Sequence, residues 1–138
     1  MKNCILIIAL LIGLNQSHAQ SDQENIRKTL LDYIEGTANG EPDRVKDAFH
    51  EDLNLYHIKK GELVVWSGKG YTDNIKPGRK SNRIGKILSI DKENDAAMAK
   101  IEIKMPGLKR IYTDYLMLLK VKGKWKIIHK SFTYRNMK

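Results

Sequence analysis

Four side chains in this sequence are candidates for a general acid or base in a pocket: Asp114, His50, His57 and His129. A pocket enzyme would need such a group in an apolar cavity, where desolvation moves a pKa toward neutrality. Asp114 stands in an apolar segment and alternates with leucines, which predicts a carboxylate on the inner side of a strand. The structural alternative is a carboxylate that only bonds a backbone amide or a neighbouring Arg or Lys.

The histidines also have structural alternatives. His50 falls where a predicted helix ends, so it is a candidate base paired with Asp114 or a residue that caps the helix. His57 alternates with apolar residues of a strand, and His129 shares a side with Trp125 and Ile127. Both histidines are candidates for ligand binding, and a hydrogen-bonded core histidine is the alternative.

Five aromatic side chains could supply cavity walls or hydroxyl donors for a planar ligand that carries oxygen atoms. They are Tyr33, Tyr56, Trp66, Tyr71 and Tyr115. Ordinary core packing is their alternative role. No HxH or HxxxH spacing occurs, and Gly68-x-Gly70 lacks the third glycine of a dinucleotide loop, so we expect neither a metal site nor a cofactor.

The residue pattern predicts two helices followed by an antiparallel sheet. Ser21 and Glu24 fit a capping box, and apolar spacings of three and four continue to Ala38. A second helix is predicted from Pro42 to about His50. Alternating residues and short turns then predict strands at 53–58, 63–66, 84–90, 96–105, 110–121 and 125–134, with a helical turn at 71–75. The expected fold class is α+β, with helices on one sheet face.

Residues 112–119 are apolar on both sides of their strand. The side that faces away from the helices would leave an exposed apolar surface. We expect a homodimer to cover it.

The N-terminal segment has the features of a secretory signal. Lys2 precedes an apolar run from Cys4 to Leu14, and Ser17-His18-Ala19 fits a cleavage site. The run is shorter than the roughly 20 residues that cross a bilayer, so we expect no transmembrane segment. The expected organisation is a signal peptide at 1–19 and one domain at 20–138, exported to the periplasm or secreted.

The formal net charge of +9 favours anionic partners in general. The densest basic cluster comprises Lys76, Arg79, Lys80, Arg83 and Lys86. Export and the lack of interleaved aromatic residues argue against nucleic acid. The cluster is either a solvated face or a contact for phosphates, an acidic polysaccharide or another acidic partner.

Five segments, in this order and spacing, carry a family resemblance: residues 33–36, 48–52, 74–78, 112–115 and 123–128. They resemble the nuclear transport factor 2-like superfamily, its SnoaL-like members and, most closely, the putative lumazine-binding family. The resemblance implies a cone-shaped, cystatin-like roll in which a strongly bent antiparallel sheet wraps around N-terminal helices. It also implies an apolar pocket at the open end, often in a homodimer, and leaves the activity open.

Three functions follow as hypotheses. The first is an exported domain that binds an unknown small molecule without catalysis. The second is a cofactor-independent lyase or isomerase in which Asp114 or His50 takes a proton from a carbon acid. The third is an interaction module at the cell envelope that uses its basic face.

Overall fold

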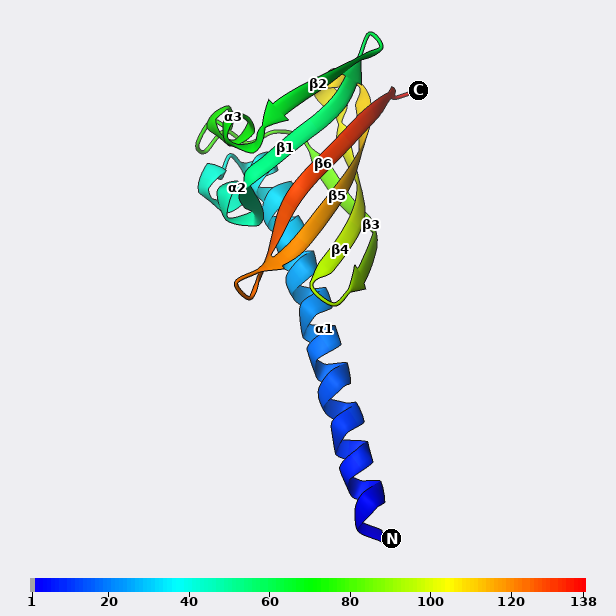
Figure 1. Cartoon of the computed structure of the whole chain (residues 1–138). Coiled ribbons are helices and arrows are strands. Elements are labelled where there is room, and N and C mark those ends of the chain that lie inside the picture. The colour runs from blue at the N-terminus through cyan, green and yellow to red at the C-terminus, as the bar shows by residue number, and fades with distance from the viewer. Residues whose placement is uncertain (1) are drawn as a thin grey trace.

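The structure is a computed structural model that describes the backbone of residues 2–138 and the side chains from residue 21 onward. Three helices and six strands follow one another along the chain, with a single 3-10 turn at Pro106–Leu108 (Figure 1). They are α1 (Lys2–Asn39), α2 (Pro42–Ala48), β1 (Phe49–Lys59), β2 (Glu62–Ser67), α3 (Gly68–Asp73), β3 (Ile84–Glu93), β4 (Ala96–Met105), β5 (Arg110–Val121) and β6 (Lys124–Asn136).

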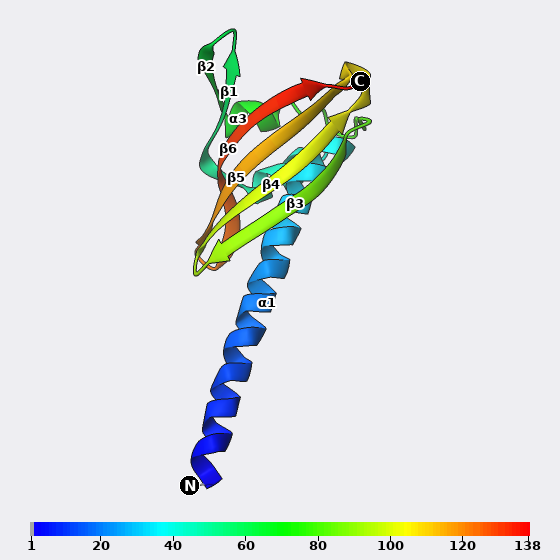
Figure 2. The ribbon, with the colours of Figure 1, turned by 90° about the vertical axis from the view of Figure 1, so that its right-hand side faces the viewer.

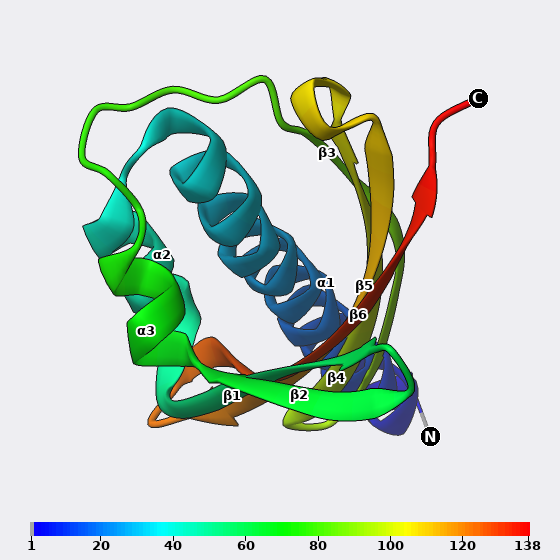
Figure 3. The same cartoon turned by 90° about the horizontal axis from the view of Figure 1, so that it is seen from above.

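The six strands form one bent sheet in the order β2-β1-β6-β5-β4-β3. The meander β3 to β6 is antiparallel throughout, as the short turns predict. The parallel pairing of β1 with β6 was not anticipated, and it joins the first hairpin to the meander. Figures 2 and 3 show the sheet curving around the C-terminal half of α1, with α2 and α3 beside the helix. The expected α+β cone is confirmed.

The core lies between α1 and the concave face of the sheet. Ile26, Leu30 and Tyr33 of α1 are fully buried, at the spacings that the sequence predicts. They pack with inward residues of the strands, among them Leu116 and Ile127. Each such aliphatic side chain contributes about 1.5–3 kcal/mol of burial free energy, so this contact fixes the helix in the cone.

The end of α1 also holds a long loop in place. Gly40, at φ 70°, ends the helix, and its carbonyl accepts a hydrogen bond from the Gly78 amide at 2.8 Å. A Cβ at Gly40 would lie 2.6 Å from the backbone of both Lys76 and Arg79, so only glycine fits. The amide of Ser81 bonds the Ala38 carbonyl at 2.8 Å. The loop 74–83 therefore crosses the helix end and leads into β3 (Figure 3).

Several element boundaries differ from the sequence prediction. The capping box at Ser21 is wrong, because α1 runs without a break through that residue. The second helix ends at Ala48, since Phe49 is already extended, and His50 therefore lies on β1. The short third helix begins at Gly68, where the Ser67 hydroxyl caps it, rather than at Tyr71.

The outer face of the sheet carries the expected apolar side chains. Met98, Tyr115 and Met117 are each about half exposed there. The homodimer through this face stays a prediction. The predicted cleavage segment 17–19 lies outside the described side chains, so signal removal and export also stay predictions. Within the described part of the chain, no helix is both long and apolar enough to cross a bilayer.

Candidate functional site

A buried carboxylate marks the floor of the site. Asp114 on β5 points to the concave side of the sheet and is 1 % exposed. Its Oδ2 accepts a hydrogen bond from the Tyr33 hydroxyl at 2.9 Å and lies 2.8 Å from the Lys130 Nζ. Lys130 also donates to the Tyr33 hydroxyl at 2.5 Å. Asp114 Oδ1 is buried and has no protein partner.

Tyr33 completes this three-residue cluster from α1. Burial and the neighbouring Asp114 carboxylate both raise the pKa of Tyr33 well above its ordinary value. The phenol therefore stays protonated and donates to Oδ2. One oxygen of Asp114 is thus fixed by two donors, while the other is free to meet a ligand.

A β-bulge in β6 brings Lys130 into this cluster. In the pairing with β5, Met117 lies opposite His129 and Leu118 opposite Ile127, so Ile128 has no partner of its own. The extra residue changes which side chains point inward. Lys130 is 4 % exposed on the concave side, whereas His129 turns to the outer side and stacks on Tyr56 at 4.8 Å between ring centroids.

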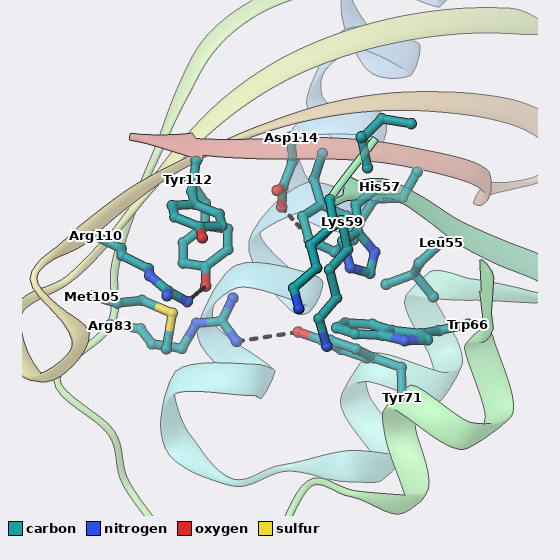
Figure 4. A pocket seen from close by; sticks show the side chains of 15 residues that line it. Leu55, His57, Lys59, Trp66, Tyr71, Arg83, Met105, Arg110, Tyr112 and Asp114 are labelled. Carbon is teal, nitrogen blue, oxygen red and sulfur yellow. Dashed lines mark hydrogen bonds and ion pairs between the residues drawn. The ribbon is translucent and has the colours of Figure 1, made fainter. Parts of the chain in front are cut away.

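A cavity of about 650 Å³ opens above Asp114, between the sheet and α3 (Figure 4). One wall is aromatic: the His57 ring lies 4.7 Å from Phe132 and 4.7 Å from Trp66, measured between centroids. His57 Nδ1 is buried without a protein partner. This volume is within the usual range for small-molecule sites.

The opposite wall carries a second tyrosine beside a cation. Arg83 Nη1 donates to the Tyr71 hydroxyl at 3.1 Å, and this hydroxyl contacts the Thr37 hydroxyl only at 3.5 Å. Burial disfavours ionisation of Tyr71, but the charges of Arg83 and Lys130, with the two hydrogen bonds, outweigh burial and lower the pKa of Tyr71. Tyr71 is therefore a stronger acid and a better hydrogen-bond donor than an ordinary tyrosine.

A second cavity of about 760 Å³ adjoins the first. Both cavities are lined by Trp66, Tyr71, Arg83 and Met105, so these side chains lie between the two spaces. The second cavity adds Lys76 and Arg79 from the loop 74–83. Part of the basic cluster thus lies at the rim of a cavity, where Lys76 and Arg79 remain exposed to solvent.

Four of the candidate residues meet in the first cavity: Asp114, His57, Trp66 and Tyr71. Tyr33 lies behind them, in contact with Asp114. The pairing of Asp114 with His50 is wrong, because His50 sits at the start of β1, in a separate small pocket.

Three other candidates also lie away from the cavity. Tyr56 and His129 stack on each other outside it, and Tyr115 is half exposed on the outer face beside Lys100. Tyr115 points outward because side chains alternate along β5 and Asp114 points inward. Within the described residues, no group of three or more potential metal ligands occurs.

Sequence reasoning missed Lys130 and Arg83. Strict alternation from Trp125 and Ile127 places Lys130 on the outer side of the sheet. No residue type around Ile128 indicates the bulge. Arg83 was grouped with the basic cluster as a surface residue. Its position next to the predicted strand at 84–90 was the available signal that it lies closer to the core.

Residues 21–133 match the protein family described as "Putative lumazine-binding". The chain belongs to this family. The chain is similar to aldolase FrzH from Cladobotryum sp, which is 29 % identical over 113 residues, covering 81 % of this chain and 90 % of that protein. The resemblance seen in the sequence is thereby confirmed.

Solved structures agree with the fold. A nuclear transport factor 2-like protein of unknown function from Silicibacter pomeroyi DSS-3 superposes with a TM-score of 0.75 at 18 % identity, covering 85 % of this chain and 98 % of that one. Another from Methylobacillus flagellatus KT gives 0.72 at 25 % identity, covering 83 % and 93 %. The chain therefore has the nuclear transport factor 2-like fold.

Proposed function

We propose that the cavity binds a small carbonyl compound and moves a proton at the carbon next to the carbonyl group, in a cofactor-independent lyase or isomerase reaction of aldol type. The observation that carries the proposal is the buried, unpartnered Oδ1 of Asp114 at the floor of a cavity whose opposite wall holds Tyr71. The similarity to a protein named an aldolase supports the same reaction class.

Asp114 has the arrangement of a positioned general base. Tyr33 and Lys130 hold Oδ2, which fixes the direction of Oδ1. The Lys130 ammonium group pairs with Oδ2 at 2.8 Å and leaves Oδ1 without a protein partner. In the reaction, the C–H bond breaks, the proton passes to Oδ1, and the electron pair moves to the carbonyl oxygen as an enolate.

Tyr71 is suited to stabilise that enolate. Its hydroxyl accepts from Arg83 and donates to the Thr37 hydroxyl only over a long 3.5 Å, so its proton can be donated to the developing oxyanion instead. The proton on Asp114 then returns to another carbon in an isomerisation. In an aldol addition, the enolate carbon attacks a second carbonyl group and the new alkoxide takes up the proton.

The proposal is tested with 5-nitrobenzisoxazole, a planar probe whose N–O bond breaks to give a nitrophenolate when a base removes the proton on C3 of its isoxazole ring. Wild-type protein is expected to accelerate the release of the nitrophenolate over acetate at equal concentration. Asp114→Asn is expected to lose the acceleration by about 10²–10⁴-fold, the usual contribution of a general base. Tyr71→Phe is expected to slow the reaction while leaving the ion pair of Asp114 and Lys130 in place.

Asp52→Asn is the matched control, because Asp52 is a solvated carboxylate on β1. His50→Gln is a second control for the rejected base. The proposal is overturned if Asp114→Asn keeps the wild-type rate in a protein with native circular dichroism, or if Asp52→Asn loses as much. An unchanged rate in Tyr71→Phe would overturn the oxyanion role of Tyr71.

A further inference from the structure

Arg83 presents an unused hydrogen-bonding edge between the two cavities. Its Nη1 bonds Tyr71, whereas Nε is buried without a protein partner, and no bond of Nη2 occurs among the described residues. Nε and Nη2 form the side of a guanidinium that pairs in parallel with the two oxygens of a carboxylate. A buried N–H without a partner destabilises the protein, so this edge is suited to a ligand that accepts hydrogen bonds.

Positive charges outnumber negative charges around the two cavities, which also favours an anionic ligand. The basic side chains that line them are Lys59, Lys60, Lys76, Arg79, Arg83, Arg110 and Lys130, and the one acidic side chain is Asp114. Asp114 is already paired with Lys130. Among the described side chains, none of the other six basic residues reaches a carboxylate at ion-pair distance, although Arg44 elsewhere contacts three.

The loop geometry fixes where Arg83 points. The loop 74–83 is tied to the end of α1 at Gly40 and Ala38, and β3 begins directly after Arg83. Figure 4 shows the guanidinium directed toward Tyr71 across the cavity. An anion on this edge would therefore lie beside the hydroxyl that is proposed to hold the enolate.

We propose that Arg83 is the specificity-determining anchor for a carboxylate of the ligand, so that the substrate is an anionic carbonyl compound with a carboxylate near its reacting centre. The carbonyl part of this statement rests on the function proposed above. The anionic part rests on Arg83 and on the surplus of cations alone. Lys130 does not compete for the carboxylate, because Asp114 and Tyr33 already occupy it.

The experiment compares two probes of the same shape, 2-naphthoate and the neutral 2-naphthalenemethanol, on the full chain. Two-dimensional NMR follows the indole N–H signals of the two tryptophans, assigned with Trp66→Phe. Trp66 lines both cavities, whereas Trp125 bonds Asp22 at the other end of the sheet. Naphthoate is expected to shift the Trp66 signal and not the Trp125 signal, and to bind more tightly than the alcohol.

Substitution then tests the anchor. Arg83→Gln is expected to weaken naphthoate about 10- to 100-fold, the range for a charge-assisted bond, and the alcohol less than about 2-fold. Arg83→Lys keeps the charge but loses the planar edge, so its affinity for naphthoate is expected to lie between those of wild type and Arg83→Gln. Arg135→Gln is the matched control, because Arg135 is exposed and contacts Glu102.

The inference is overturned if naphthoate leaves the Trp66 signal unmoved, if Arg83→Gln binds it as wild type does, or if Arg135→Gln weakens it equally. Asp114→Asn separates the two proposals. It removes the negative charge from the cavity and leaves Lys130 without its counter-charge, so naphthoate binding is expected to persist or strengthen while proton removal from 5-nitrobenzisoxazole is lost. Failure of the base and failure of the anchor therefore give different results.

Discussion

Replacing Lys130 by methionine removes one charge from the cluster at the floor of the cavity. The aliphatic stem is kept, so the packing against Phe132 and Tyr33 changes little. The Asp114 carboxylate is left with Tyr33 as its single donor. Breaking a buried pair in this way costs about 3–5 kcal/mol, a large part of the 5–15 kcal/mol that a domain of this size has.

The double variant Lys130→Met/Asp114→Asn gives the coupling free energy between the two side chains. Asp114→Asn alone leaves the Lys130 ammonium buried without a counter-charge and is also expected to cost about 3–5 kcal/mol. With both changes, no unpaired charge remains in the core. The double variant is therefore expected to be more stable than the sum of the single variants predicts, with a coupling free energy of about 2–3 kcal/mol.

Urea unfolding followed by far-ultraviolet circular dichroism measures each free energy. The matched control is the pair of Lys28 and Asp32 on α1, with a similar distance of 2.7 Å but side-chain exposures of 75 % and 16 %, against 6 % and 1 % for Lys130 and Asp114. Its coupling is expected to be at most about 0.5 kcal/mol. If the losses of unfolding free energy at Lys130 and Asp114 add within about 0.5 kcal/mol, the two side chains are not energetically coupled and the prediction is refuted.

Two further predictions concern Tyr71 and Gly40. Of the six tyrosines, Tyr71 is expected to ionise first as pH rises, because the net effect of burial, Arg83 and Lys130 lowers its pKa. A lowered pKa stabilises the folded state as pH rises through it toward the unfolded value of about 10. A pH titration followed by phenolate absorbance measures this first ionisation. The step should be absent in Tyr71→Phe and should move to higher pH in Arg83→Gln. Titration curves that are unchanged in both variants would contradict the prediction. Gly40→Ala is expected to cost at least about 1–2 kcal/mol in urea unfolding, from its positive φ and the contact with the loop 74–83, and Gly78→Ala, at φ 72° with open space around it, less.

The sheet was predictable because its signals are local. Two hairpins turn at Lys60-Gly61 and Lys122-Gly123, where both residues have positive φ, and such pairs favour two-residue hairpin turns. Between turns, alternation defines the strands, and this places Asp114 inward correctly. The parallel pair of β1 and β6 was not predictable in this way, because it joins segments far apart in the chain.

The site was predicted in part for the same reason. Asp114, His57 and Trp66 lie on regular stretches of strand, and alternation alone orients them. Lys130 follows a bulge, and one extra residue exchanges the sides of every residue beyond it. The sequence pattern therefore puts His129 in the cavity and Lys130 outside, the reverse of the structure.

The charges decide which ligand the cavity can accept. A neutral ligand would displace water from Arg83 without replacing the hydrogen bonds that the water makes. Removing an unpaired charge from water costs much free energy. An anion on the Arg83 edge would compensate that loss and place the ligand beside Tyr71. In the function proposed above, the reacting carbon would then lie between the Asp114 carboxylate and the Tyr71 hydroxyl. Binding selectivity and proton transfer would then depend on one arrangement, in which Gly40 positions the loop that carries Arg83 and the bulge at Ile128 positions Lys130.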